Sequence, residues 1–321
     1  MAFIGLLPLV AGCPLDDDDL AIDDLYLITV DDAGTLAVRT TTDKAWPELV
    51  SSYVSPGTGY FVDVDGPWIY LGSWGGGLII LDGTDPGSLL EVGSFRATAA
   101  SESGSVVVRD GLAFVGEYAN GLAIVDVSVP ESPVEVGRAG DFAAAVALMG
   151  DLALAAGPAP VRIYDISDPG VPAYVDLISL FDPVNDLLVD GELVYMATDD
   201  GLEIVDLSDP TEPLSLGGIE TTDRALGLAL YDEHVFVAAG EAGVRGVDVS
   251  DPSNPVETWT DGWSSHANDV AIHGGWLWVA DDAGGPDPYD VGNPDSPRKV
   301  LLESYSSSAL KSVTPWPRDD S

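Results

Sequence analysis

Residues 201–210 read GLEIVDLSDP, and variants of this stretch recur along the chain. Each variant is a short apolar run that ends on an aspartate and leads into a polar turn, and the other copies are GLIILD at 77–82, GLAIVD at 121–126, VRIYD at 161–165, GVRGVD at 243–248 and a degenerate YD at 289–290. The final aspartates are spaced by 44, 39, 41, 42 and 42 residues. Four strands of about five residues with four connections of about five fill such a period, so each copy predicts one four-stranded antiparallel unit.

The unit around Asp248 shows the four strands most clearly, at 225–230, 235–239, 244–249 and 256–259. Asp-Gly pairs at 65–66, 110–111 and 190–191 predict tight hairpin turns between first and second strands, because Asp-Gly tolerates the positive φ angles of a type I′ turn. Ser-Asp-Pro turns follow the third strand, and a later proline opens the fourth, where a missing N–H is tolerated at a sheet edge.

The repeated units resemble LVIVD repeats, a propeller family of bacterial and archaeal secreted proteins, from about Leu25 to Trp316. The resemblance implies a β-propeller and an exported protein. It implies no particular activity, because most members have none assigned.

The two chain ends decide the number of blades. Residues 25–30, 35–39 and 49–53 match second, third and fourth strands without a first strand, and residues 308–314 match a first strand with nothing after it. We therefore predict an all-β, seven-bladed β-propeller over 25–316, closed by a C-terminal strand that joins the N-terminal blade, with 317–321 as a tail. Six and eight blades are the alternatives.

The N-terminus resembles a prokaryotic lipoprotein signal. A short apolar run closes on Val10-Ala11-Gly12-Cys13, which corresponds to a lipobox, so we expect a signal peptide over 1–12 and lipid on Cys13. The following Asp16 to Asp19 predict an acidic tether over 13–24. The expected location is exported and membrane-anchored, at the cell surface or envelope of a prokaryote.

The charge balance limits the partners. Asp and Glu number 54 against 12 Lys and Arg, for a net charge of −42. Such a surface repels phosphate backbones and anionic headgroups, which excludes nucleic acid and leaves the lipid anchor as the contact with the membrane. A salty habitat, where charges are screened, and an ordinary solvated surface both account for the acidity.

Generic catalytic motifs are absent from the sequence: it has no Gly-x-Ser-x-Gly, His-Glu-x-x-His, Cys-x-x-Cys or P-loop pattern. Of three histidines, only His266 has polar neighbours, Ser264, Ser265, Asn268 and Asp269. We therefore predict a surface binding or interaction module without catalytic activity. The alternative is a hydrolase or lyase that uses carboxylates and His266 at the channel mouth.

Acidic pairs are candidates for a calcium site, since calcium takes six to eight oxygen ligands. The best candidates are Asp31, Asp32, Asp281 and Asp282, which fall on blades beside the predicted closure. The alternative is that these aspartates are solvated, because an acidic chain contains such pairs by chance. No other cofactor is expected.

Aromatic and polar residues predicted at the channel mouth are candidates for ligand binding. They are Trp74, Glu102, Tyr118, Asn185, Asp186, Arg224, His266, Asp269 and Lys311. The expected partner is a surface protein, a peptide or a carbohydrate. Packing between blades is the alternative role for Trp74 and Tyr118.

Overall fold

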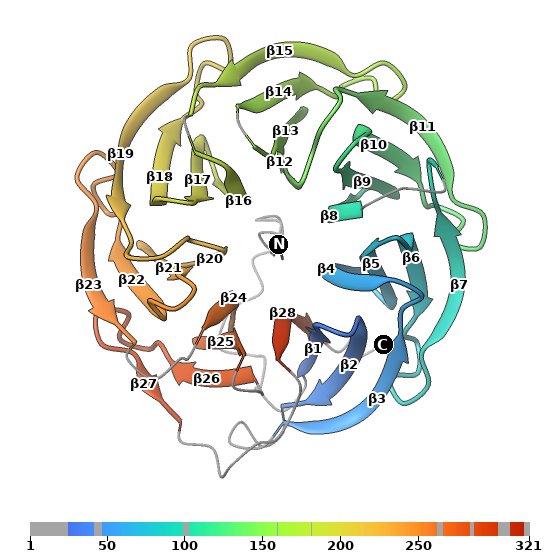
Figure 1. Ribbon diagram of the computed structural model, residues 1–321, viewed down its shortest axis with the longest axis horizontal. Helices are drawn as coiled ribbons and strands as arrows, with labels where there is room; N and C mark the ends of the chain where they lie inside the picture. The colour runs from blue at the N-terminus through green and yellow to red at the C-terminus, as the bar shows by residue number, and fades with distance from the viewer. Residues whose placement is uncertain are drawn as a thin grey trace.

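The computed structural model describes residues 25–41, 47–98, 103–158, 160–180, 182–261, 266–282, 286–300 and 309–317. In these ranges every regular element is a β-strand, and the strands form seven four-stranded antiparallel sheets around a central axis (Figure 1). The protein is a seven-bladed β-propeller, which confirms the predicted fold and blade number.

Within each blade the strands follow one another from the channel outward. The closing blade and the two after it are, from the inner to the outer strand, β28 (Leu310–Pro317), β1 (Leu25–Asp31), β2 (Thr35–Thr40), β3 (Glu48–Val54); β4 (Thr58–Asp65), β5 (Trp68–Trp74), β6 (Gly77–Asp82), β7 (Leu90–Phe95); β8 (Ser103–Arg109), β9 (Leu112–Glu117), β10 (Gly121–Asp126), β11 (Val134–Ala139). The remaining four are β12 (Ala145–Met149), β13 (Leu152–Ala156), β14 (Val161–Asp165), β15 (Ala173–Ile178); β16 (Val184–Asp190), β17 (Leu193–Thr198), β18 (Gly201–Asp206), β19 (Leu214–Glu220); β20 (Gly227–Tyr231), β21 (His234–Ala238), β22 (Val244–Asp248), β23 (Val256–Thr260); β24 (Ala267–His273), β25 (Trp276–Asp281), β26 (Pro286–Asp290), β27 (Arg298–Lys299).

The ring closes where the two ends of the chain pair. β28 lies antiparallel to β1, with partners running from Leu25↔Pro317 to Asp31↔Leu310. This confirms that a C-terminal strand completes the N-terminal blade, although the strand begins two residues later than expected and extends to Pro317. The pairing removes the open sheet edge that an unclosed array would expose.

The recurring third strand is mostly apolar because blades pack on both of its faces. Successive strand residues point to opposite sides. On β18, Ile204 packs in the cluster shared with the next blade, while Val205 packs in the cluster shared with the preceding one. One such apolar cluster lies between each pair of adjacent blades, seven in all among the described residues.

The aspartate that ends each third strand shapes the turn after it. Asp206 Oδ1 accepts a hydrogen bond from the Ser208 backbone N–H at 2.8 Å, and this bond lowers the pKa of Asp206 below its ordinary value. The same contact recurs at Asp82, Asp126, Asp165, Asp248 and Asp290. The most regular residue of the repeat is therefore a turn former and not a ligand.

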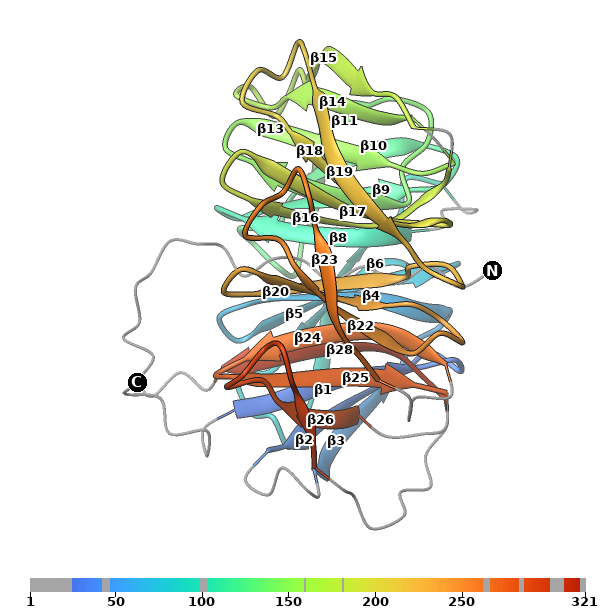
Figure 2. The ribbon, with the colours of Figure 1, turned by 90° about the vertical axis from the view of Figure 1, so that its left-hand side faces the viewer.

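Each blade twists strongly from its inner to its outer strand. Figure 2 shows the ring from its edge, with β19 and β23 lying steeply across the direction of β16 and β20. This is the right-handed sheet twist accumulated over four strands. It leaves the inner strands as the wall of the channel and their ends as its two rims.

Candidate functional site

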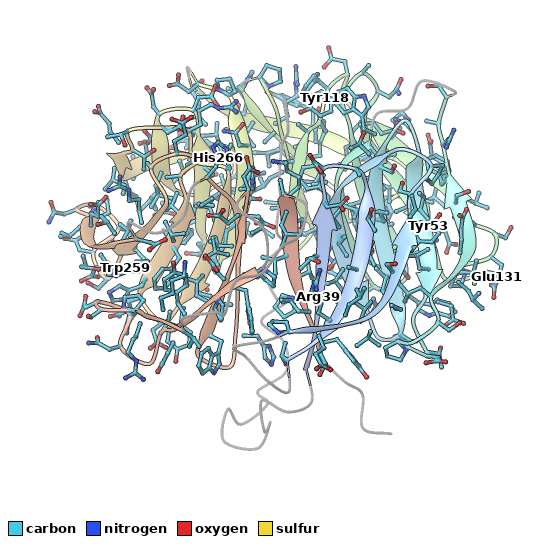
Figure 3. All side chains as sticks on the ribbon, turned by 60° about the horizontal axis from the view of Figure 1, so that its bottom comes forward. Arg39, Tyr53, Tyr118, Glu131, Trp259 and His266 are labelled. Carbon is cyan, nitrogen blue, oxygen red and sulfur yellow. The ribbon has the colours of Figure 1, made fainter. Side chains whose placement is uncertain are left out.

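One face of the ring carries the candidate residues. In every blade the first strand begins, and the second strand ends, on the same side of the ring; we call this side the mouth face. Trp74, Tyr118, Asn185, Arg224, His266 and Lys311 all fall there, and the labels of Tyr118 and His266 lie along the upper side of the ring in Figure 3. Glu102 and Cys13 lie outside the described residues.

An aromatic row crosses three neighbouring blades of the mouth face. Trp74 ends β5, Tyr118 follows β9, and Phe142 lies in the loop that leads into β12. The ring centroids of Trp74 and Tyr118 are 4.9 Å apart, and those of Tyr118 and Phe142 are 5.0 Å apart, both edge to face. All three are half-buried, so each side chain packs against its neighbours and is also partly accessible to solvent. Phe142 was not among the predicted residues, and its only signal in the sequence is its place before an inner strand.

A buried ion pair supports this row and was also not predicted. Glu117, the last residue of β9, is 0% exposed, and its Oε2 accepts a 2.6 Å hydrogen bond from Arg138. Arg138 also donates to Glu135 and to the Asn120 carbonyl oxygen. Burial lowers the pKa of Arg138, but the bonds to Glu135 and Glu117 outweigh it and raise that pKa above its ordinary value. The pair holds the second-to-third-strand turn that carries Tyr118.

Asn185 and Arg224 meet at a second sector of the mouth face. Asn185 is 0% exposed, and its Nδ2 donates to Asp199 Oδ1 at 3.0 Å and to the Ala225 carbonyl oxygen at 2.8 Å. Arg224 Nη1 lies 3.7 Å from the same Asp199 oxygen. The structure therefore brings these two predicted residues together around Asp199.

Lys311 belongs to a matching arrangement at the closure of the ring. Its Nζ lies 2.6 Å from Asp282 Oδ1 and 3.3 Å from Asn268 Oδ1. Asn268 Nδ2 donates to Asp282 Oδ1 at 2.7 Å. Burial raises the pKa of Asp282, but the bonds from Lys311 and Asn268 outweigh it, so that pKa lies below its ordinary value.

Asp186 and Asp269 lie within the wall of the ring. Asp186 Oδ1 accepts from its neighbour Leu187 N–H, and its Oδ2 accepts from Leu228 N–H of the next blade at 2.9 Å. Asp269 makes the same two contacts, to Val270 and, at 3.1 Å, to Val313. Both side chains are buried, and burial raises the pKa of Asp269 well above its ordinary value despite these bonds. Their geometry joins blades and directs neither carboxylate toward the mouth.

His266 is half-buried and lies near two carboxylates. Burial raises the pKa of Asp223, but backbone bonds from Glu241 and Arg224 outweigh it, and His266 lowers the pKa further. His266 acts on Asp282 in the same direction. Its predicted neighbours Ser264 and Ser265 fall outside the described residues. His234 lies on the opposite side, buried, with Nε2 3.1 Å from Asp295.

Two of the four predicted calcium ligands are engaged with other groups. Asp31 Oδ1 accepts from the Ala33 and Thr35 backbone N–H groups of its own turn, while Asp282 pairs with Lys311. Asp281 is buried and Asp32 exposed. Among the described residues, no group of three or more His, Cys, Asp or Glu is placed to hold a metal ion. Calcium binding stays a prediction.

The described part of the chain also has no helix long and apolar enough to cross a membrane.

Fold and site together define a class: a seven-bladed β-propeller whose mouth face carries an aromatic row and two amide–carboxylate pairs. The chain belongs to the LVIVD repeat family, whose profile matches residues 56–97, 100–141, 183–221, 224–260 and 264–306. No curated protein matches its sequence.

Many solved structures share the fold, and two of them show how far the likeness extends. One is provisionally assigned as a 6-phosphogluconolactonase from Bacteroides uniformis, with a TM-score of 0.72 and 11% identity, covering 92% of this chain and 100% of its own. The other is the computationally designed Ika8 protein, with a TM-score of 0.62 and 13% identity, covering 83% of this chain and 80% of its own. At such low identity the likeness concerns the fold alone.

Proposed function

We propose that the protein is a non-catalytic binding module that takes its ligand on the mouth face and is held at the cell surface by lipid on Cys13. The observation that carries this proposal is the aromatic row Trp74–Tyr118–Phe142 on the same face as the charged groups Arg224 and Lys311. Partly accessible aromatic side chains beside fixed polar groups suit a peptide or a carbohydrate.

The state of the carboxylates at the mouth face and in the wall behind it favours binding over catalysis. Asp199 and Asp282 are paired with Arg224 and Lys311, and Asp186 and Asp269 accept backbone N–H groups. A general acid or base needs a carboxyl group within reach of substrate and free to exchange a proton. Groups fixed in this way serve recognition and structure better.

Two observations favour the alternative, a hydrolase or lyase. His266 lies close enough to Asp223 and Asp282 to lower the pKa of both, and the fold is similar to that of the provisional lactonase. A panel of lactones, esters and uronide polymers separates the two functions. Turnover that is lost in His266→Ala, with binding retained, would replace the binding proposal by the enzyme.

Ligand binding is tested with arrays of peptides and glycans probed with the purified ring. We expect Trp74→Ala and Tyr118→Ala to weaken any array hit at least tenfold, since buried aromatics dominate binding energies. The matched control is Tyr174→Ala, which removes a 56% exposed ring on outer strand β15. Hits that are equally weakened by Tyr174→Ala, or unchanged by all three, would contradict a mouth-face site.

The anchor rests on the lipobox-like Val10-Ala11-Gly12-Cys13. Expressed in a prokaryote, the full chain should partition into detergent and Cys13→Ser into the aqueous phase, because the lipid is lost with the thiol. Equal partitioning of the two would remove the anchor from the proposal and leave the binding site untouched.

A further inference from the structure

Two blades carry the same asparagine–aspartate pair on the mouth face. Asn268 Nδ2 donates to Asp282 Oδ1 at 2.7 Å and to the Leu310 carbonyl oxygen at 2.9 Å. Asn185 Nδ2 donates to Asp199 Oδ1 at 3.0 Å and to the Ala225 carbonyl oxygen at 2.8 Å. Because both partners of each nitrogen are acceptors, the orientation of each amide is fixed, and its oxygen faces away from them.

The two pairs differ in the group that contacts the asparagine amide oxygen. At the closure, Lys311 Nζ lies 3.3 Å from Asn268 Oδ1 and 2.6 Å from Asp282 Oδ1. Lys311 follows Leu310, and the residue that follows the equivalent Ala225 is the buried Leu226. Asn185 Oδ1 is itself buried and has no hydrogen-bond partner within the described ranges. A buried amide oxygen without a donor costs stability, so such groups are rare without a functional reason.

The charges around Asn185 favour a cation. Asp182 lies close enough to Asp199 and Asp200 to be repelled by them, and Glu203 is repelled by Asp182 and Asp200; burial, followed by this repulsion, raises the pKa of Asp182 and of Glu203. Arg224 forms an ion pair with Asp199, and its 3.7 Å separation from that carboxylate exceeds hydrogen-bond length. The potential at the pair is therefore negative even with Arg224 present.

We infer that the Asn185–Asp199 pair binds a primary ammonium group of the ligand, such as a lysine side chain, in the place that Lys311 takes at Asn268–Asp282. An ammonium has three donors and suits one amide oxygen beside one carboxylate. Calcium needs six to eight oxygens, and the described residues form no group of three or more acidic, His or Cys side chains placed for a metal. The inference rests on the proposed function, because it makes the ligand a lysine-bearing peptide or protein.

Asn185 is 0% exposed, so an ammonium has to approach its oxygen past the partly exposed Asp199 and Arg224. The side chains of Asp199 and Arg224 are 27% and 33% exposed. An incoming ammonium displaces the long Arg224 contact and gains the unpaired amide oxygen of Asn185, which Arg224 does not reach. The site therefore exchanges a weak ion pair for a stronger one and satisfies a buried acceptor.

The test uses a pair of variants that exchange the lysine between blades. The probe is Nα-acetyl-lysine amide, and the readout is the side-chain amide signal of Asn185 in nitrogen-15 NMR. We expect a saturable shift that is at least tenfold weaker with the Nε-acetylated probe. Leu226→Lys should supply the ammonium internally and abolish the response, while the matched control Leu226→Met keeps it. Lys311→Met should create a second response, at Asn268.

Other outcomes are equally informative. A shift with calcium or potassium chloride, and none with the lysine probe at equal ionic strength, would make the pair a metal site and overturn the inference. The inference would also be overturned if the lysine probe shifted neither the Asn185 signal in the wild type nor the Asn268 signal in Lys311→Met. If an array ligand binds Leu226→Lys as tightly as the wild type while Trp74→Ala loses it, the proposed function stands and only the ammonium site falls.

Discussion

Single side chains on the inner strands connect one blade to the next. Asp186 and Asp269 accept backbone N–H groups of Leu228 and Val313, and Ser105 takes the same role toward Val146. Asp63, on inner strand β4, accepts from Val64 and, at 2.6 Å, from Val108 of the next blade. Part of its side chain reaches solvent, yet the protein packed around it raises its pKa to about 7.

Asp63 should therefore make stability depend on pH. A carboxyl whose pKa is raised on folding contributes stability that is full below its unfolded pKa of about 4 and is lost as pH rises through about 7. As pH rises from 5 to 8 in constant salt, we expect the stability of Asp63→Asn in urea unfolding to fall less than that of the wild type. Asp151→Asn, which changes an exposed turn residue, is the control. Parallel pH profiles of wild type and Asp63→Asn would contradict the raised pKa.

The sequence predicted on which face of the ring a residue lies, but it did not predict the direction in which the side chain points. Strand order alone placed Asn185, Arg224 and Lys311 on one face. It did not reveal that Asp186 and Asp269 turn into the wall, because the pairing register shifts between Val184 and Asp186 and between Ala267 and Asp269. A one-residue shift reverses the face of every following side chain, and no local residue pattern marked these bulges.

At the scale of elements, outer strands lie against the turn of the next blade. A Cβ added to Gly137 on β11 would lie 1.9 Å from the Pro169 carbonyl oxygen, and one added to Gly93 on β7 would lie 1.9 Å from that of Pro130. In the closing blade, Ser51 stands at the position equivalent to these glycines, and its hydroxyl donates a hydrogen bond to the Pro86 carbonyl oxygen. The repeat predicted the strands and turns within one or two residues at Asp248 but gave no sign of this contact between blades.

Gly137→Ala should destabilise the ring by about 1–3 kcal/mol, because a backbone carbonyl has to move to admit the methyl group. Gly170→Ala is the matched control, since its Cβ would meet the Asp168 carboxylate at 3.3 Å and the Val136 carbonyl oxygen only at an ordinary contact distance of 3.7 Å. Urea unfolding measures both. Equal stability of the two variants would show that the contact between outer strand and turn is loose.

At the scale of the whole molecule, the net charge of −42 opposes the compact ring. Carboxylates repel one another more in the folded protein than in the extended chain, so stability should increase with salt. The amino-acid composition leads to this expected salt dependence, and the strand patterns at the two chain ends predicted the closure of the ring. The mouth chemistry was predicted less well, because groups such as Glu117, Arg138 and Phe142 become neighbours only through folding.

The melting temperature should rise as sodium chloride increases from about 0.1 to about 1 M, where the Debye length falls from about 10 to about 3 Å. Calcium chloride at matched ionic strength should give a similar rise if the effect is screening alone. An additional calcium increment that is lost in the combined Asp281→Ala and Asp282→Ala variant would instead establish the predicted calcium site. A melting temperature independent of salt would refute the electrostatic explanation.

The closed ring positions both amide–carboxylate pairs, and Asp282 of the last blade meets Lys311 on the closing strand β28. Amide hydrogen exchange of β1 and β28 tests this closure most directly. We predict that the paired amides of Ile28–Val30 and Ser312–Thr314 exchange as slowly as those of β16 and β17. Fast exchange throughout β28, with the other inner strands protected, would mean that the ring is open and that the mouth-face site is not assembled.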